Sequence, residues 1–383
     1  MDEANKLYSD LLDGHNKMIR PLHDNKKSTM VNMSFSLISI KDFDEVTGKF
    51  SVVGLLKVTW QDNRMIWNKT EYGNMNSIIF EQNDVWKPNL FLGNAFDDMS
   101  AIGEDFMTIR YYNNGTAIWT PLDMIITSCS VDVTHFPFDQ QTCAIHFISV
   151  GTLPEEIFMN SEIDHAILTR YTEHEIWQLN ETTAFASIVA DAGSLFSVLI
   201  TVNRNPLFYL VNIIFPIILL TFLNSFVFLL PATSGERISF SITVLLAIAV
   251  FMTMISSYLP KTSRTMSRVC YFLISNLIFS CIICLLTIIQ LRLFHTCDTC
   301  SIPTILRRLT VMCKSQKHRK YFPNHQDQKQ NGGDTCDNEA TRTDILAKVS
   351  WVDVSQALDI FMLLVSLCIQ LCMLVALFVS ILY

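Results

Sequence analysis

The chain has few of the residues on which disulfide scaffolds and metalloenzymes depend. Its 383 residues include 11 cysteines and 9 histidines, and the cysteines are too scattered for a disulfide-rich scaffold. Cys297 and Cys300 have the spacing of a metal or redox pair, but no second pair follows at zinc-ribbon spacing. His165 and His174 lack metal-ligand spacing. The sequence therefore gives little support to an enzyme, a metal site or a bound cofactor.

Hydrophobic residues, by contrast, are abundant and concentrate in the second half. They make up 50% of the chain, and mean hydropathy is +0.30. Residues 1–205 carry 14 Lys and Arg against 27 Asp and Glu, a net of −13, whereas residues 206–383 carry 14 against 9, a net of +5; together these give −8. An acidic half joined to a basic, apolar half indicates a membrane protein whose acidic half lies outside.

The first half has the pattern of a strand-rich domain. Apolar spacing over Ala4–Met18 predicts a short amphipathic helix, and short alternating segments over Val31–Asn205 predict an all-β sandwich. Cys129 and Cys143, the two cysteines of this half, most simply pair with each other in an oxidising compartment. A closed loop of about 15 residues stabilises by roughly 3 kcal/mol. Four glycosylation sequons lie here, at Asn32, Asn68, Asn114 and Asn180.

The second half contains four apolar runs long enough to cross a membrane. They are Leu207–Leu230, Ile238–Tyr258, Val269–Leu291 and Ala357–Tyr383. The domains expected are an extracellular β-sandwich (1–205), three transmembrane helices (206–291), a cytoplasmic insert with a basic helix and a flexible linker (292–353), and a fourth transmembrane helix (354–383). We expect a multi-pass plasma membrane protein, since the basic insert belongs on the cytoplasmic side.

The second run differs from the others because hydroxyl residues recur along it. Spacings of three and four place six residues on one stripe: Ser239, Thr243, Leu246, Val250, Thr253 and Ser257. Hydroxyls lower the cost of a passing hydrated ion, whereas a ring of Leu and Val closes the path by dewetting. Hydrogen bonding between packed helices is the alternative role for such hydroxyls. Glu236 at the cytoplasmic end favours a cation pore, which several copies of the chain must enclose.

A disulfide-loop motif relates the chain to a known family. Cys129 and Cys143 enclose 13 residues that include Phe136-Pro137-Phe138-Asp139. This spacing and internal motif resemble the defining loop of the Cys-loop receptors. The segments Trp86-Lys87-Pro88-Asn89 and Gly235-Glu236-Arg237 resemble the nicotinic branch. The resemblance covers almost the whole chain apart from the cytoplasmic insert.

The resemblance implies a ligand-gated ion channel. The chain would form a homopentamer or heteropentamer around a central pore in membrane lipid, bind a small molecule between subunits and pass inorganic cations, with no nucleic-acid partner. Four residues of the disulfide loop would couple binding to gating: Phe136, Pro137, Phe138 and Asp139. Glu236, with no Pro-Ala pair inserted beside it, is similar to the cation-selective type. An anion channel of the same family is the nearest rival.

The chain departs from the nicotinic pattern at the aromatic box that holds acetylcholine by cation–π contacts. Gly93 stands where the family has a Tyr, and Leu55 and Val150 stand where it has Trp. No Cys or Tyr occurs between Glu173 and Leu207, where the family has a capping loop with two Tyr and a Cys pair. The expected ligand-binding residues are mostly apolar: Leu55, Gly93, Ile118, Val150, Phe185, Ala186, Ile188 and Val189, with Asp191 able to attract a cationic ligand.

Two explanations of the missing box remain open. In one, the chain is an accessory subunit whose partner supplies the principal binding face. In the other, the cleft binds a hydrophobic or bitter compound through apolar area. The second is similar to the chemotactile branch of nicotinic-like receptors in cephalopods. A membrane-anchored adhesion protein without a pore would account for the sandwich, but not for the hydroxyl stripe.

Overall fold

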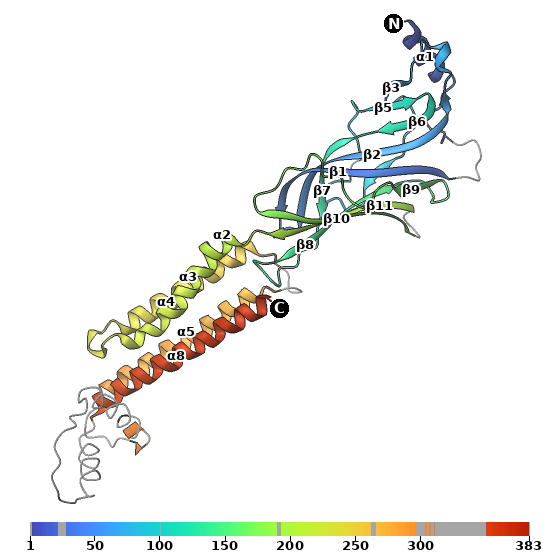
Figure 1. Cartoon of the computed structure of the whole chain (residues 1–383). Helices are drawn as coiled ribbons and strands as arrows, with labels where there is room; N and C mark the ends of the chain where they lie inside the picture. The colour runs from blue at the N-terminus through green and yellow to red at the C-terminus, as the bar shows by residue number, and fades with distance from the viewer. Residues whose placement is uncertain are drawn as a thin grey trace, which may run out of the picture. The chain divides into compact units, whose positions relative to one another are not determined.

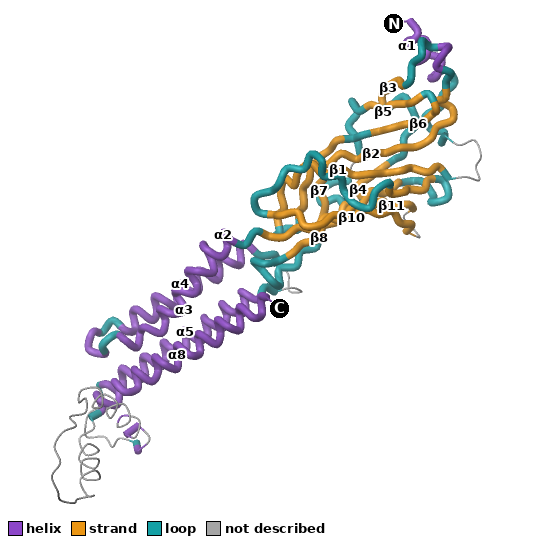
Figure 2. Tube along the Cα trace, in the orientation of Figure 1, coloured by secondary structure: helices purple, strands orange, loops and turns teal. Residues whose placement is uncertain are grey.

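The structure, a computed structural model, describes residues 2–21, 28–99, 101–189, 193–261, 266–295, 303–304, 306–307, 310 and 350–382. The chain divides into two compact units. The first comprises Met1–Val133, Pro137–Pro206 and Tyr258–Thr265, and the second comprises Thr134–Phe136, Leu207–Ser257 and Met266–Tyr383. The strands belong to the first unit and the four long helices to the second (Figure 2).

The first unit is a β-sandwich preceded by a helix (Figure 1). In chain order its elements are α1 (Asp2–Leu12), β1 (Thr29–Asp44), β2 (Lys49–Ile66), η1 (Lys69–Glu71), β3 (Ser77–Glu81), β4 (Leu90–Leu92), β5 (Thr108–Tyr112), β6 (Asn114–Trp119), β7 (Leu122–Ser128), β8 (Gln140–Ser149), β9 (Ile157–Ser161), β10 (Trp177–Val189) and β11 (Gly193–Arg204). The predicted all-β sandwich with an N-terminal helix is confirmed.

Two sheets enclose the core of this unit. The seven-stranded sheet has the order β3-β5-β6-β2-β1-β9, with β7 also paired to β2, and the four-stranded sheet has the order β10-β11-β8-β4. Strand residues alternate between core and surface, as a sandwich requires. Phe35 of β1 lies 6.1 Å from Phe147 of β8, and Phe147 stacks at 6.0 Å on Phe196 of β11, all three fully buried. These rings join the two sheets across the core.

The N-terminal helix is shorter than the apolar spacing predicted. It ends at Leu12 rather than at Met18. Gly14 follows at φ +70°, the left-handed conformation in which helices commonly end, and the amide of His15 donates to the carbonyl of Leu12 at 3.0 Å.

The second unit holds four helical spans that are long and apolar enough to cross a membrane. The elements of this part are α2 (Leu207–Tyr209), η2 (Leu210–Ile214), α3 (Phe215–Ser225), η3 (Phe226–Leu229), η4 (Ala232–Ser234), α4 (Arg237–Tyr258), α5 (Arg268–Phe294) and α8 (Trp351–Leu382). The segments α2 to η3 together make the first span, Leu207–Leu229. Four apolar helices were predicted, and four are confirmed among the described residues.

The first span is irregular around its proline. Pro216 has no amide hydrogen to donate, and the preceding turn, Leu210–Ile214, is a π-helix. A single wider turn of this kind is a common way for a helix to accommodate proline.

Two helices extend beyond the predicted boundaries. The third span continues to Phe294, and the fourth begins at Trp351 rather than at Ala357. Ser350 explains the early start, because its hydroxyl accepts from the amide of Asp353 at 3.3 Å while the Asp353 carboxylate accepts from the amide of Ser350 at 3.1 Å, a reciprocal helix cap. Most of the predicted cytoplasmic insert, with its basic helix and linker, lies outside the described residues.

Candidate functional site

The predicted ligand-binding residues fall on two different sheets. Leu55 on β2 and Ile118 on β6 are half-buried on the outer face of the seven-stranded sheet, since their neighbours Leu56 and Trp119 point into the core. Thr59 lies four residues after Leu55 and therefore on the same face of β2. Because Thr59 pairs with Ile118 of β6, Leu55 and Ile118 share that face. This face is one half of the predicted site.

The other half belongs to the four-stranded sheet. Gly93 follows β4, Val150 follows β8, and four predicted residues lie on β10: Phe185, Ala186, Ile188 and Val189. Exposed fractions are 45% for Val150, 41% for Phe185 and for Val189, and 57% for Ile188. Because β10 alternates, Phe185 and Val189 face one side and Ala186 and Ile188 the other. Asp191 lies outside the described residues.

A histidine that the sequence pattern did not single out lies on the outer face of this sheet. Phe185 pairs with Ser197 of β11, and Ser197 pairs with His146 of β8, so the three side chains form a row across the sheet. His146 Nδ1 lies 2.9 Å from Ser197 Oγ, and burial lowers the pKa of the His146 imidazole. Strand alternation counted from buried Cys143 would have placed His146 on this face.

Gly93 borders the row and leaves space beside it. The Gly93 amide donates to the His146 carbonyl at 2.7 Å, which fixes the loop next to β8. A Cβ at Gly93 would approach Ile148 Cγ2 at 3.1 Å and His146 Cβ at 3.5 Å. A larger side chain at this position would therefore begin directly beside His146, and glycine leaves that side uncovered.

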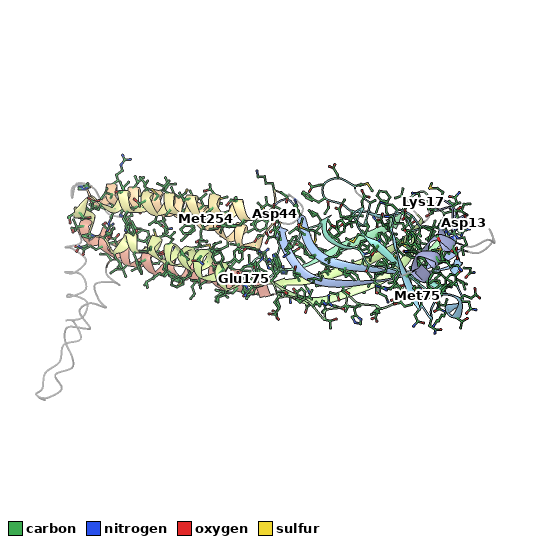
Figure 3. All side chains as sticks on the ribbon, turned by 90° about the horizontal axis from the view of Figure 1, so that it is seen from above. Asp13, Lys17, Asp44, Met75, Glu175 and Met254 are labelled. Atoms are coloured by element: carbon green, nitrogen blue, oxygen red, sulfur yellow. A yellow bond between two sulfur atoms is a disulfide. The ribbon has the colours of Figure 1, made fainter. Side chains whose placement is uncertain are left out.

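Within the described part of the β-sandwich, the predicted binding residues do not line the hollow that the structure shows there. This hollow has a volume of about 650 Å³ and is lined by other residues, among them Tyr171, Glu173, Glu175 and Trp177. Glu175 is labelled in Figure 3. The two predicted halves remain on separate sheets, as expected of a site that two subunits share.

The helix α4 has two distinct faces. Five side chains are buried against the rest of the unit: Arg237, Ser241, Val244, Ile248 and Ile255. All seven predicted pore-lining residues are exposed instead: Glu236, Ser239, Thr243, Leu246, Val250, Thr253 and Ser257. Met254, labelled in Figure 3, also lies on this helix and is 37% exposed. In one chain the predicted stripe is thus left open to a neighbour or a pore.

The hydroxyls of the stripe are held by their own helix. Thr243 donates to the carbonyl of Ser239 at 2.8 Å, Thr253 donates to that of Val250 at 2.8 Å, and Ser257 donates to that of Met254. Each hydroxyl oxygen still has lone pairs that can accept. The stripe can therefore offer acceptor oxygens to a cation without a partner on another helix.

Neighbouring residues at the start of α4 have opposite environments. Gly235 adopts φ +72°, and the exposed Glu236 accepts the first helical bond from the amide of Phe240 at 3.0 Å. Arg237 is 2% exposed and forms a two-pronged ion pair with Asp359 of α8, at 2.8 and 2.7 Å. Glu236 is therefore exposed, whereas the adjacent Arg237 is buried against the fourth span.

The predicted coupling residues differ in environment. Asp139 is buried and pairs with Arg204, whose Nε lies 2.7 Å from Asp139 Oδ1, while Arg204 Nη1 lies 2.6 Å from Glu45. Phe136 is buried and packs edge-on against Tyr209 at 5.0 Å. Pro137 is buried and Phe138 is exposed. Thr262–Thr265 of the link between the second and third spans lie outside the described residues, so the predicted coupling contact stays a prediction.

The structure also places the predicted disulfide and the four glycosylation sequons. Cys129 and Cys143 form a disulfide. Asn68, Asn114 and Asn180 are exposed, whereas Asn32 is half-buried in β1 and accepts from Asn160 at 3.0 Å. Glycosylation therefore stays a prediction that is better supported at the three exposed sequons.

Both units match models of one protein family. Residues 4–205 match the neurotransmitter-gated ion-channel ligand binding domain, and residues 213–356 match the neurotransmitter-gated ion-channel transmembrane region. The chain belongs to the neurotransmitter-gated ion channel family, whose members are ligand-gated channels and not enzymes. It is a multi-pass plasma membrane protein with an extracellular ligand-binding domain.

Its relatives include nicotinic subunits from several animals. Acetylcholine receptor subunit alpha-1-B of Xenopus laevis is 30% identical over 317 residues, which cover 81% of this chain and 69% of the frog subunit. Neuronal acetylcholine receptor subunit alpha-2 of Homo sapiens is 30% identical over 77% of this chain, and acetylcholine receptor subunit beta-like 1 of Drosophila melanogaster is 28% identical over 75%. The chain spans 56% of the length of these last two.

Proposed function

We propose that the chain is a subunit of a pentameric cation channel that opens when a hydrophobic small molecule binds between subunits. The observation that carries this proposal is the exposure of Val150, Phe185 and Val189 beside the uncovered Gly93, at the positions where the nicotinic pattern has its aromatic box. Exposed apolar groups of this kind favour a ligand that buries apolar area.

Binding between subunits is supported by the division of the site. Leu55 and Ile118 occupy the seven-stranded sheet, and Val150 and Phe185 occupy the four-stranded sheet. In a ring of like subunits, one sheet of each chain can meet the other sheet of its neighbour, because head-to-tail contacts repeat around the ring. Each interface would then unite the two halves.

Conduction of cations is supported by α4. Its exposed stripe is polar at both ends and apolar at Leu246 and Val250, the arrangement of a wet pore with a hydrophobic constriction. Glu236 exposes its carboxylate at the cytoplasmic end, and a ring of carboxylates attracts cations. The anion-channel alternative has no such support at this position.

The ligand is a hydrophobic or bitter compound and the role is chemosensory, as in the cephalopod chemotactile branch that the chain resembles. The loss of every expected box aromatic supports this assignment, since a quaternary ammonium would find no ring at Leu55, Gly93 or Val150. Beside these apolar residues lies a hydrogen-bonding pair, the half-buried His146 and the buried Ser197.

An accessory subunit is the second candidate. Its support is that Leu55 and Ile118 present an outer sheet face that can serve as the complementary half of a site whose principal half comes from a partner chain. A subunit of this kind would assemble but would not respond to any ligand alone.

Whole-cell recording from cells that express this chain alone tests the proposal. The cells receive acetylcholine and then a panel of hydrophobic and bitter compounds, and the reversal potential is read in sodium-substituted baths. We expect current to hydrophobic compounds but not to acetylcholine, reversing with the sodium gradient. Reversal with chloride would contradict the role of Glu236, and silence despite surface pentamers would favour the accessory subunit.

A further inference from the structure

The inner end of α4 carries a basic residue next to the acid that is expected to select cations. Glu236 and Arg237 are adjacent in sequence, so five copies would bring five positive charges to the level of the carboxylate ring. A cation at the start of a helix is also disfavoured by the helix dipole. Selectivity for cations therefore requires something that removes Arg237 from the ion path.

The fourth span supplies that partner. Nη1 and Nη2 of Arg237 lie 2.8 and 2.7 Å from the two carboxylate oxygens of Asp359, and its Nε donates to the carbonyl of Leu230 at 2.6 Å. Arg237 is 2% exposed and Asp359 is 9% exposed. Such fork-to-fork pairs fix both the charge and the orientation of the guanidinium.

We propose that Asp359 determines the ion selectivity of the pore by holding Arg237 on the buried face of α4, so that Glu236 alone sets the charge at the inner mouth. Asp359 is a positioning residue: it lies on α8, away from the exposed stripe, and acts through Arg237. The inference rests on the proposed pore.

Loss of the Asp359 carboxylate would leave the Arg237 guanidinium without its ion-pair partner. An unpaired guanidinium is costly to keep buried, and the exposed carboxylate of the adjacent Glu236 offers it a new partner. Arg237 would then neutralise the ring of Glu236 carboxylates, whose charge is not compensated while Arg237 is paired with Asp359. A unit charge about one helical turn from the ion path changes the energies of passing ions enough for about a tenfold change in permeability ratio.

The experiment measures the sodium-to-chloride permeability ratio from reversal potentials in a NaCl gradient. Since the agonist is unidentified, the channels carry Leu246→Thr, which wets the apolar constriction and lets the full chain conduct without ligand. Three further variants are made in this background: Asp359→Asn, Arg237→Gln with Asp359→Asn, and Gln370→Leu. The last is the matched control, because Gln370 accepts from Ser225 at 2.7 Å and thus also ties the fourth span to a neighbour, without charge.

We expect Asp359→Asn to lower the permeability ratio about tenfold, the double variant to restore it, and Gln370→Leu to leave it unchanged. An unchanged ratio in Asp359→Asn overturns the inference, and so does a lowered ratio that the double variant fails to restore. If Asp359→Asn carries no current, a conducting, cation-selective double variant still supports the inference, whereas a silent double variant assigns Asp359 to folding and overturns it. Chloride selectivity or absence of current in Leu246→Thr itself contradicts the proposed cation pore instead.

Discussion

Two surfaces of the chain expose side chains that their surroundings disfavour. One is the outer face of the four-stranded sheet, and the other is the exposed face of α4. The sheet lies in the extracellular half, yet it exposes Val150, Phe185 and Val189. The helix lies in the membrane half, yet it exposes Ser239 and Thr243. Apolar patches in water and hydroxyl stripes in a membrane helix usually mark surfaces that bind something.

The two surfaces differ in what completes them. The sheet face gains by burying apolar area, so its partner is an apolar ligand or a second subunit. The helix face exposes hydroxyls, so we expect it to face the water and ions of a pore that other copies enclose. In the proposed channel one chain carries an incomplete ligand site and an incomplete pore, and assembly is expected to complete both.

The largest effect is expected at Glu236, which gives the helix face its charge. Replacing it by lysine, Glu236→Lys, changes the inner mouth by two charges per subunit. Over five subunits this should lower the sodium-to-chloride permeability ratio at least about a hundredfold. Reversal potentials in a NaCl gradient measure the ratio. Glu155→Lys, an exposed acid of the ligand-binding half, is the control and should leave it unchanged; the same shift in both variants would remove the special role of Glu236.

The sheet face is tested by Phe185→Ala. Removing a ring that a hydrophobic ligand covers should cost about 2 kcal/mol of binding, which is about thirtyfold in the concentration that gives half-maximal current. Ile79→Ala, on β3 at the edge of the other sheet and 44% exposed, is the matched control and should leave potency as it is. Equal losses in the two variants would mean that the exposed apolar residues act through stability and not through the ligand.

The sequence predicted the exposed stripe of α4 because helical spacing is fixed by the backbone, and Ser239, Thr243 and Leu246 had to share a face. It could not predict the Arg237–Asp359 pair, whose members are 122 positions apart and meet through the packing of two helices. Similarly, alternation could place His146 on a face, but its contact with Ser197 depends on the register of β8 and β11. Contacts within one element were predictable, and contacts between elements required the fold.

A moderate effect is expected at Thr243, whose hydroxyl lies on the exposed stripe. Thr243→Val keeps the shape and removes the oxygen that a hydrated ion can approach. At about 1 kcal/mol for a lost hydrogen bond, single-channel conductance should fall about fivefold. Ser241→Ala removes a hydroxyl from the buried face of the same helix and should leave conductance unchanged. If Ser241→Ala lowers conductance equally, the two faces of α4 are not functionally distinct.

The smallest effect is expected at His146, the titratable member of the sheet face. Burial lowers the pKa of its imidazole, so the neutral form is favoured in the folded protein. A hydrophobic ligand that covers the ring would lower this pKa further, and by linkage protonation must weaken ligand binding. Binding should be independent of pH above about 6.5, the ordinary pKa of histidine, and should weaken as pH falls through the lower pKa of the folded protein. We expect a loss of potency that is small beside the effects above and that grows as the pH is lowered below 6.5. His146→Gln should abolish this dependence. His165→Gln, which changes an exposed histidine beside Asp164, should retain it. Persistence of the pH effect in His146→Gln would place the titrating group elsewhere.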